Sequence, residues 1–172
     1  LHFDNGQSVS FGRLVSTIPL PDLVRICPEA PPEVREAAGQ LRTNSILVVN
    51  LGIPRANVSD WHWAHFPERD VSFFRISFPH NFAENVAPAG LSSISAEVAY
   101  SPERPVDPAG IVERVVDDLR RVRVLRSDDK VAFTMTRDIR YACCIHDYPR
   151  KAAVRRIRDW FLANDVIPDG RY

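Results

Sequence analysis

Glycine is scarce in this sequence, with 7 residues in 172, and each one stands alone. Neither Gly-x-Gly-x-x-Gly nor Gly-x-x-x-x-Gly-Lys occurs, so the chain can build neither a dinucleotide-binding fingerprint nor a P-loop. Glycine-rich turns are what normally bring the backbone close to a phosphate group. The shortage therefore excludes nucleotide binding by this chain alone.

Cysteine, net charge and long apolar runs are also missing. Three cysteines, an odd number, argue against a disulfide framework and favour a reducing compartment, so we expect a cytoplasmic protein. Lys plus Arg equals Asp plus Glu, at 22 each, which gives no basic field to attract nucleic acid. No apolar run reaches the roughly 18–20 residues of a membrane span. We expect no nucleic-acid partner and no membrane span.

The composition that is present describes an ordinary globular protein. With 172 residues, 45% hydrophobic and 26% charged, the chain suits one domain with room for a small appendage. No shift in composition marks a second domain boundary. The chain begins at Leu1 rather than Met and stops at Tyr172, so we expect a piece of a longer protein.

Apolar periodicity predicts more strands than helices. The pair Asn5-Gly6 predicts a tight hairpin near the N-terminus. The run 45–51 (SILVVNL) is typical of a central strand covered on both faces. Strands are predicted at 14–18, 45–51, 61–66, 71–78 and 91–100, and a long strand or strand pair at 130–145. Helices are predicted after Pro19, from Pro32, over 111–122 and from Pro149. This order predicts an α+β fold with a mixed, largely antiparallel sheet of about five to seven strands flanked by helices and preceded by a short β-hairpin.

Two of the predicted strands carry charge within apolar surroundings. Alternation places Phe73 and Arg75 on one face of the first strand and Glu97 on one face of the second. If the strands pair, Arg75 and Glu97 meet as a cross-strand ion pair. The pair is either a solvated structural contact or a cavity-facing pair that binds a substrate anion, and the sequence leaves both open.

The segment from Trp61 to Phe66 is the densest aromatic cluster. His62 and His65 are an odd number of residues apart and point to opposite faces of a strand, so a metal site using both is not expected. Trp61, Trp63 and His65 share one face. That face is either aromatic packing within a sheet or the lining of an apolar ligand cavity.

Two further patterns favour structural roles. Cys143 and Cys144 are neighbours without a Cys-x-x-Cys spacing, and we expect them to be small buried hydrophobic residues. The basic run within 150–158 is typical of the solvated face of an amphipathic helix. Neither an activated nucleophile nor a general base is evident, so we expect no catalytic residue and no metal site in this chain.

Several stretches, in this order along the chain, resemble the superfamily of flavin-dependent amine oxidases and protoporphyrinogen oxidases. The stretches are 4–20, His65-Phe66-Pro67-Glu68 with Phe73-Phe74-Arg75-Ile76 (similar to Y-F-P-E … F-Y-R-V), 92–98 (similar to S-S-I-x-A-E-V) and 141–147 (similar to Y-A-Y-x-I-Y-D). Cys143 and His146 depart from the family, which has Tyr at both positions. Gly170-Arg171-Tyr172 resembles the start of a G-R-F/Y-G-x-W segment that returns the family's chain to its flavin domain.

The resemblance implies one part of a larger flavoenzyme. Residues 1–19 would be the hairpin and strand leading from an absent FAD-binding domain, and 20–172 the substrate-binding domain. The parent would bind FAD and a small-molecule substrate, whereas this fragment would bind no FAD and be inactive. The implied FAD-contacting residues are Ser16, Thr17, Pro19, Gly170 and Arg171. The expected cavity residues are Trp61, Trp63, His65, Phe73, Arg75 and Glu97.

Two alternatives stay open at this point. One is a freestanding ligand-binding or interaction module without redox activity, and the other is part of a flavoenzyme similar to UDP-galactopyranose mutase. A Gly-x-Gly-x-x-Gly motif encoded before Leu1 would favour the flavoenzymes, and a start codon close to Leu1 the module. A domain cut from its parent is expected to expose a contiguous apolar face, which a second copy can cover as a homodimer.

Overall fold

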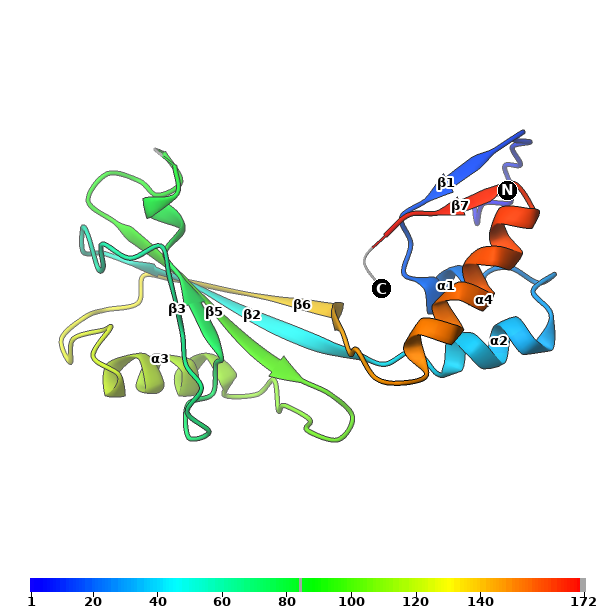
Figure 1. Ribbon diagram of the computed structural model, residues 1–172. Coiled ribbons are helices and arrows are strands. Elements are labelled where there is room, and N and C mark those ends of the chain that lie inside the picture. The colour runs from blue at the N-terminus through cyan, green and yellow to red at the C-terminus, as the bar shows by residue number, and fades with distance from the viewer. Residues whose placement is uncertain (84, 171–172) are drawn as a thin grey trace. The chain divides into compact units, whose positions relative to one another are not determined.

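The computed structural model describes residues 1–83 and 85–170 (Figure 1). The chain forms two compact units: unit 1 comprises residues 1–43 and 143–172, and unit 2 is Asn44–Ala142. The chain crosses between the units inside two long strands, β2 (Thr43–Ile53) and β6 (Phe133–Cys144), so no proline- or glycine-rich linker marks the boundary.

Unit 2 is built on a five-stranded sheet. Its strand order is β3-β4-β5-β2-β6, where β3 is Trp63–His65, β4 is Arg75–Ser77 and β5 is Ser92–Tyr100. The pairs β3–β4, β4–β5 and β2–β5 are all antiparallel. The predicted α+β class with a largely antiparallel sheet is confirmed.

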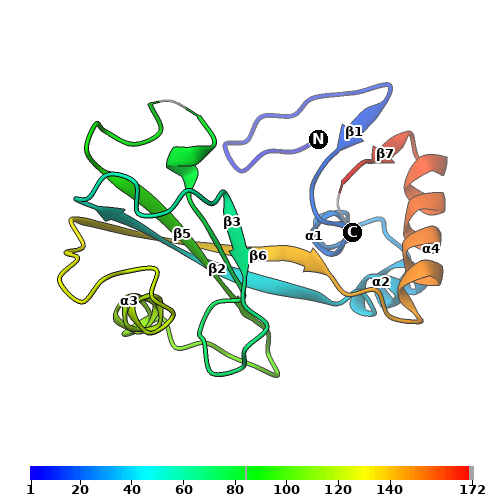
Figure 2. The ribbon, with the colours of Figure 1, turned by 60° about the vertical axis from the view of Figure 1, so that its left-hand side comes forward.

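One helix, α3 (Ile111–Arg121), lies against one face of this sheet (Figures 1 and 2). Ile111, Val115 and Leu119 recur at helical spacing and are at most 3% exposed. They pack on the alternate residues of the two central strands that point to the same side. These strand residues are Leu47, Val49, Leu51, Ile53, Ile94, Ala96 and Val98.

The second face of β2 differs from the expectation. Leu47, Val49 and Leu51 are buried, whereas Val48 and Asn50 between them are half-buried. Within the described part of unit 2, a helix therefore covers one face of β2 and not both. Val48 is apolar although it lies on the other face. The alternation of buried and exposed positions is therefore not visible in the sequence of this strand.

Strand β4 is shorter than the predicted strand 71–78 and begins with an irregularity. The Phe74 N–H donates to the Glu97 carbonyl at 3.0 Å, while Arg75 is the register partner of Glu97. Two residues thus oppose one, the geometry of a β-bulge. The bulge shifts the alternation, so Phe73 is 1% exposed in the core with Ile76. The expectation that Phe73 and Arg75 share a face is wrong.

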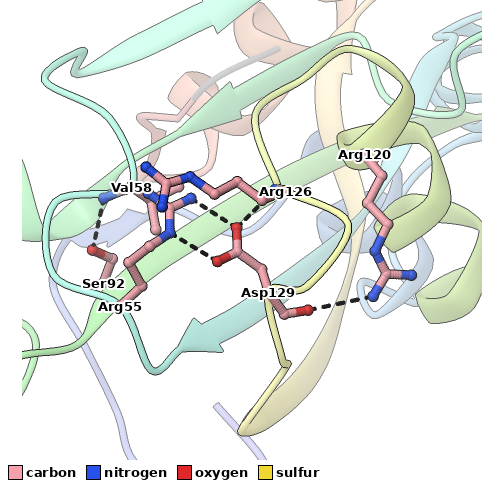
Figure 3. A network of polar contacts seen from close by, with 6 residues as sticks. All are labelled: Arg55, Val58, Ser92, Arg120, Arg126 and Asp129. Carbon is pink, nitrogen blue, oxygen red and sulfur yellow. Dashed lines mark hydrogen bonds and ion pairs between the residues drawn. The ribbon is translucent and has the colours of Figure 1, made fainter.

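A polar network ties the loop after β2 to the loop before β6 (Figure 3). Nε and Nη2 of Arg55 donate to the two carboxylate oxygens of Asp129 at 2.8 and 2.7 Å. The backbone N–H of Arg126 donates to the same carboxylate at 2.8 Å, and Arg120 donates to the Asp129 carbonyl at 3.4 Å. The Arg55 hydrogen bonds hold the pKa of the buried Asp129 carboxyl below its ordinary value.

Unit 1 is a small helical core with a two-stranded sheet. Its elements are β1 (Leu14–Ser16), α1 (Leu20–Arg25), α2 (Pro32–Gly39), α4 (Arg150–Ala163) and β7 (Val166–Pro168). Leu20, Val34 and Phe161 are each at most 2% exposed at its centre. β1 and β7 pair in parallel, with Leu14 opposite Val166. Strand β7 was not predicted, because three residues are too short for a period to show.

Three smaller features of the structure bear on the expectations from the sequence. The N-terminal hairpin is present, with His2 bridged to Ser8 and Gly6 at φ 81°. Cys143 is exposed and Cys144 only partly buried, so the expected burial of this pair is wrong for Cys143. In the described ranges, no helix has the length and apolarity needed to cross a membrane, and no His, Cys, Asp or Glu cluster could hold a metal.

Candidate functional site

The open face is the side of the unit 2 sheet opposite α3, and two rows of side chains define it. The first row is His65, Arg75, Glu97 and Val48, and the second is Trp63, Ser77, Ser95 and Asn50. Residues directly opposite each other on paired strands project to the same side of a sheet. Four of the six residues expected to line a cavity therefore lie on one surface.

Arg75 and Glu97 form the centre of the open face. Nε and Nη2 of Arg75 donate to Glu97 Oε1 at 2.9 and 2.7 Å, and Nη2 also donates to Oε2 at 2.8 Å. The predicted cross-strand ion pair is confirmed. The Arg75 side chain is 36% exposed and that of Glu97 is 15% exposed, so solvent screens the pair only in part. Among the described residues, Nη1 of Arg75 has no hydrogen-bond partner, and its two N–H groups can donate to a ligand.

The second row adds neutral polar groups beside the ion pair. Ser95 Oγ donates to Asn50 Oδ1, and Asn50 Nδ2 donates to the Met135 carbonyl at 3.4 Å. Asn50 was missed as a site residue. The signal that could have found it is the single amide side chain within the apolar run 45–51, because such a group needs hydrogen-bond partners wherever it is buried.

Aromatic side chains border the open face at its β3 edge. Trp63 is 61% exposed on β3, and Trp61, which precedes the strand, is 58% exposed. Nδ2 of Asn81, in the short 3-10 helix η1 (Pro79–Asn81), donates to the Trp61 carbonyl at 2.6 Å. Exposed indole rings offer broad, rigid surfaces on which a ligand can stack.

The remaining predicted site residues lie elsewhere. Phe73 belongs to the core of unit 2, while Ser16, Thr17, Pro19 and Gly170 belong to unit 1. Ser16 is 6% exposed, and its hydroxyl accepts the Ile18 N–H at 3.4 Å. Arg171 lies outside the described residues.

The described residues do not by themselves form a site for FAD. The dinucleotide's pyrophosphate is usually held by a glycine-rich turn at a helix N-terminus, and every glycine here is isolated in the sequence. Ser16, the hydroxyl expected near FAD, is buried and already accepts a hydrogen bond.

Comparisons with known proteins agree on one fold. A reduced UDP-galactopyranose mutase is similar with TM-score 0.88 at 21% identity, over 96% of this chain and 37% of that one. A putative protoporphyrinogen oxidase from Exiguobacterium sp. 255-15 is similar with TM-score 0.72 at 17% identity, over 97% and 37%. An oxidoreductase from Methanosarcina mazei is similar with TM-score 0.62 at 13% identity, over 92% and 37%. The chain thus spans about a third of the length of these structures, and no curated protein matches it.

The five-stranded sheet, with one helix against one face, belongs to a fold that this chain shares with these structures. The family model for flavin-containing amine oxidoreductases matches residues 1–140. The chain belongs to that family.

Proposed function

We propose that this chain is the substrate-binding portion of an FAD-dependent oxidoreductase and that its open face lines the substrate cavity. The observation that carries the proposal is the Arg75–Glu97 pair, which lies on the side of the sheet that α3 leaves open. Glu97 accepts from Nε and Nη2 and so fixes the guanidinium, which leaves Nη1 to donate to an anionic or carbonyl group.

The groups around the pair support a cavity of mixed character. Ligand sites combine apolar and aromatic surface with a few well-placed polar groups. Trp63 supplies aromatic surface at one edge, while Ser77 and Ser95 supply hydroxyl groups next to Arg75. In flavoenzymes the redox chemistry is the cofactor's, so this portion has to bind and orient the substrate.

The test uses the longer parent protein that contains this chain. We expect the purified parent to show the absorbance of bound flavin, and its absence would contradict the proposal. Arg75→Met should leave flavin content unchanged but weaken ligand binding about tenfold or more, since it removes a charge-assisted hydrogen bond. Arg123→Met, an exposed cation after α3, is the matched control and should change neither.

A second candidate is a flavoenzyme similar to UDP-galactopyranose mutase. The observation that favours it is the TM-score of 0.88, against 0.72 for the protoporphyrinogen oxidase-like structure. The two candidates predict different reactions of the bound flavin. Anaerobic benzylamine should bleach the flavin of an amine oxidase, whereas a mutase should isomerise UDP-galactopyranose without lasting bleaching.

The proposal extends to the surroundings of the chain. Its three cysteines are free, which supports a reducing compartment such as the cytoplasm. The missing FAD-binding domain of the same chain is the expected partner. The division into residues 1–19 and 20–172 and the homodimer through an exposed apolar face stay predictions.

A further inference from the structure

Strand β6 adds its own side chains to the open face. A Cβ atom at Gly52 would lie 3.1 Å from the Cβ of Phe133, so these two positions project to the same side of the sheet. Gly52 is the register partner of Ser93 and alternates along β2 with Val48 and Asn50, which belong to the open face. Phe133 therefore also lies on the open face.

Alternation along β6 places two more side chains beside Phe133. Met135 and Arg137 follow it at intervals of two residues and so project to the same side. A contact on the opposite side agrees with this: the Tyr100 hydroxyl, which packs against the core beneath α3, donates to Asp138 Oδ1 at 2.6 Å. Phe133, Met135 and Arg137 together form the β6 stripe.

The first two residues of the β6 stripe present apolar surface. Phe133 is 58% exposed and Met135 is 46% exposed. Gly52 has no side chain, so the neighbouring strand leaves the surface beside the Phe133 ring uncovered. Both side chains suit an aromatic ligand, because aromatic rings stack on one another and a thioether sulfur contacts ring edges favourably.

The third residue carries a positive charge that no other side chain of the open face neutralises. Among the described strand residues of this face, Glu97 is the only carboxylate, and Arg75 already donates to both of its oxygens. Arg137 forms no ion pair with any described residue. Asp138, its neighbour in the chain, lies on the α3 side. The charge of Arg137 is therefore available to an anion.

The number and geometry of the donors limit which anion fits. One guanidinium carries one charge, which a carboxylate balances, and its planar fork matches the two carboxylate oxygens. Successive residues of the stripe are about 7 Å apart along β6, so an apolar body on Met135 and an acidic group on Arg137 fit one small molecule.

We propose that the β6 stripe binds the aromatic carboxylate portion of the substrate, with the ring on Phe133 and Met135 and the carboxylate on Arg137. This inference rests on the proposed function, because it assigns a substrate class to the same open face. Arg75, whose charge Glu97 already neutralises, is left to donate to another polar group of the same ligand.

The experiment titrates 3-phenylpropionate and its neutral counterpart 3-phenylpropionamide separately into the 15N-labelled chain at matched ionic strength. We expect saturable amide shifts centred on residues 133–137 and 50–52. The carboxylate should bind about tenfold more tightly than the amide, since only the carboxylate makes a charge-assisted pair. Equal affinities, or the absence of saturable shifts, would overturn the proposal. Tighter binding of phenyl phosphate would overturn the assignment to a carboxylate.

Variants separate a site from diffuse attraction. Arg137→Gln should weaken 3-phenylpropionate binding about tenfold and remove its advantage over the amide. Met135→Ala should weaken both ligands alike, because it removes apolar contact only. Arg140→Gln removes the same charge from the other side of β6 and should change neither affinity. Equal weakening by Arg137→Gln and Arg140→Gln would refute the stripe. All three side chains are exposed, so the substitutions open no cavity in the core.

Failure of this inference is distinguishable from failure of the proposed function, because the titration needs no flavin. A parent protein that carries flavin, together with a chain that does not prefer the carboxylate, would refute the β6 stripe alone. A parent without flavin would refute the proposed function whatever the titration shows.

Discussion

Replacing Asp129 by alanine is expected to destabilise unit 2 by about 3 kcal/mol. Asp129 accepts two hydrogen bonds from Arg55 and one from the Arg126 N–H, and its side chain is only 6% exposed. Removing one partner of a buried ion pair usually costs about 3–5 kcal/mol. The Arg55 side chain is 21% exposed and can recover some hydration, so we expect the lower end of that range.

Hydrogen exchange of the amides that pair β2 with β5 measures this loss in unit 2 alone. A loss of about 3 kcal/mol corresponds to exchange roughly 100-fold faster. The control is Asp117→Ala, because Asp117 has 76% of its side chain exposed and pairs with Arg120 at 3.4 Å. Such a surface pair contributes less than about 1 kcal/mol. Similar exchange rates in the two variants would refute the reasoning.

The pH dependence gives a second check on the same carboxylate. Arg55 lowers the pKa of Asp129 in the folded chain, so the stabilisation is complete above the ordinary Asp pKa near 4. It is lost as the pH falls through the lowered, folded-state value. The difference in stability between the natural chain and Asp129→Ala should therefore shrink below about pH 4, and a difference that stays constant there would contradict the assignment.

Two further pairs of variants test the fold. Gly110 has φ 76°, so Gly110→Ala should lower the stability of unit 2 by about 1 kcal/mol. Gly39 lies in α2 at an ordinary φ with open space around it, so Gly39→Ala should leave unit 1 as stable or raise its stability by about 0.5 kcal/mol. Thermal unfolding of the two variants compares these effects. Phe161 is 2% exposed, so Phe161→Ala should lower the stability of unit 1 by about 3–5 kcal/mol. Its neighbour Leu162 is 47% exposed, so Leu162→Ala should lower the stability far less. Urea denaturation measures both losses of stability.

Local patterns in the sequence predicted the regular helices and strands of this fold. The stripe of α3 was visible because its buried positions recur every three to four residues. The contact between Arg75 and Glu97 was predictable because both lie at alternating positions of strands that pair. The isolated glycines alone excluded a phosphate-binding turn in this chain.

Tertiary structure decided what no local period encodes. The bulge opposite Glu97 places Phe73 in the core, because one extra residue reverses the alternation between the positions before it and those after it. The parallel pairing of β1 with β7 joins segments from the two ends of the chain. A sequence determines which residues are buried or charged through short-range periodicity, whereas long-range pairing determines which of them meet.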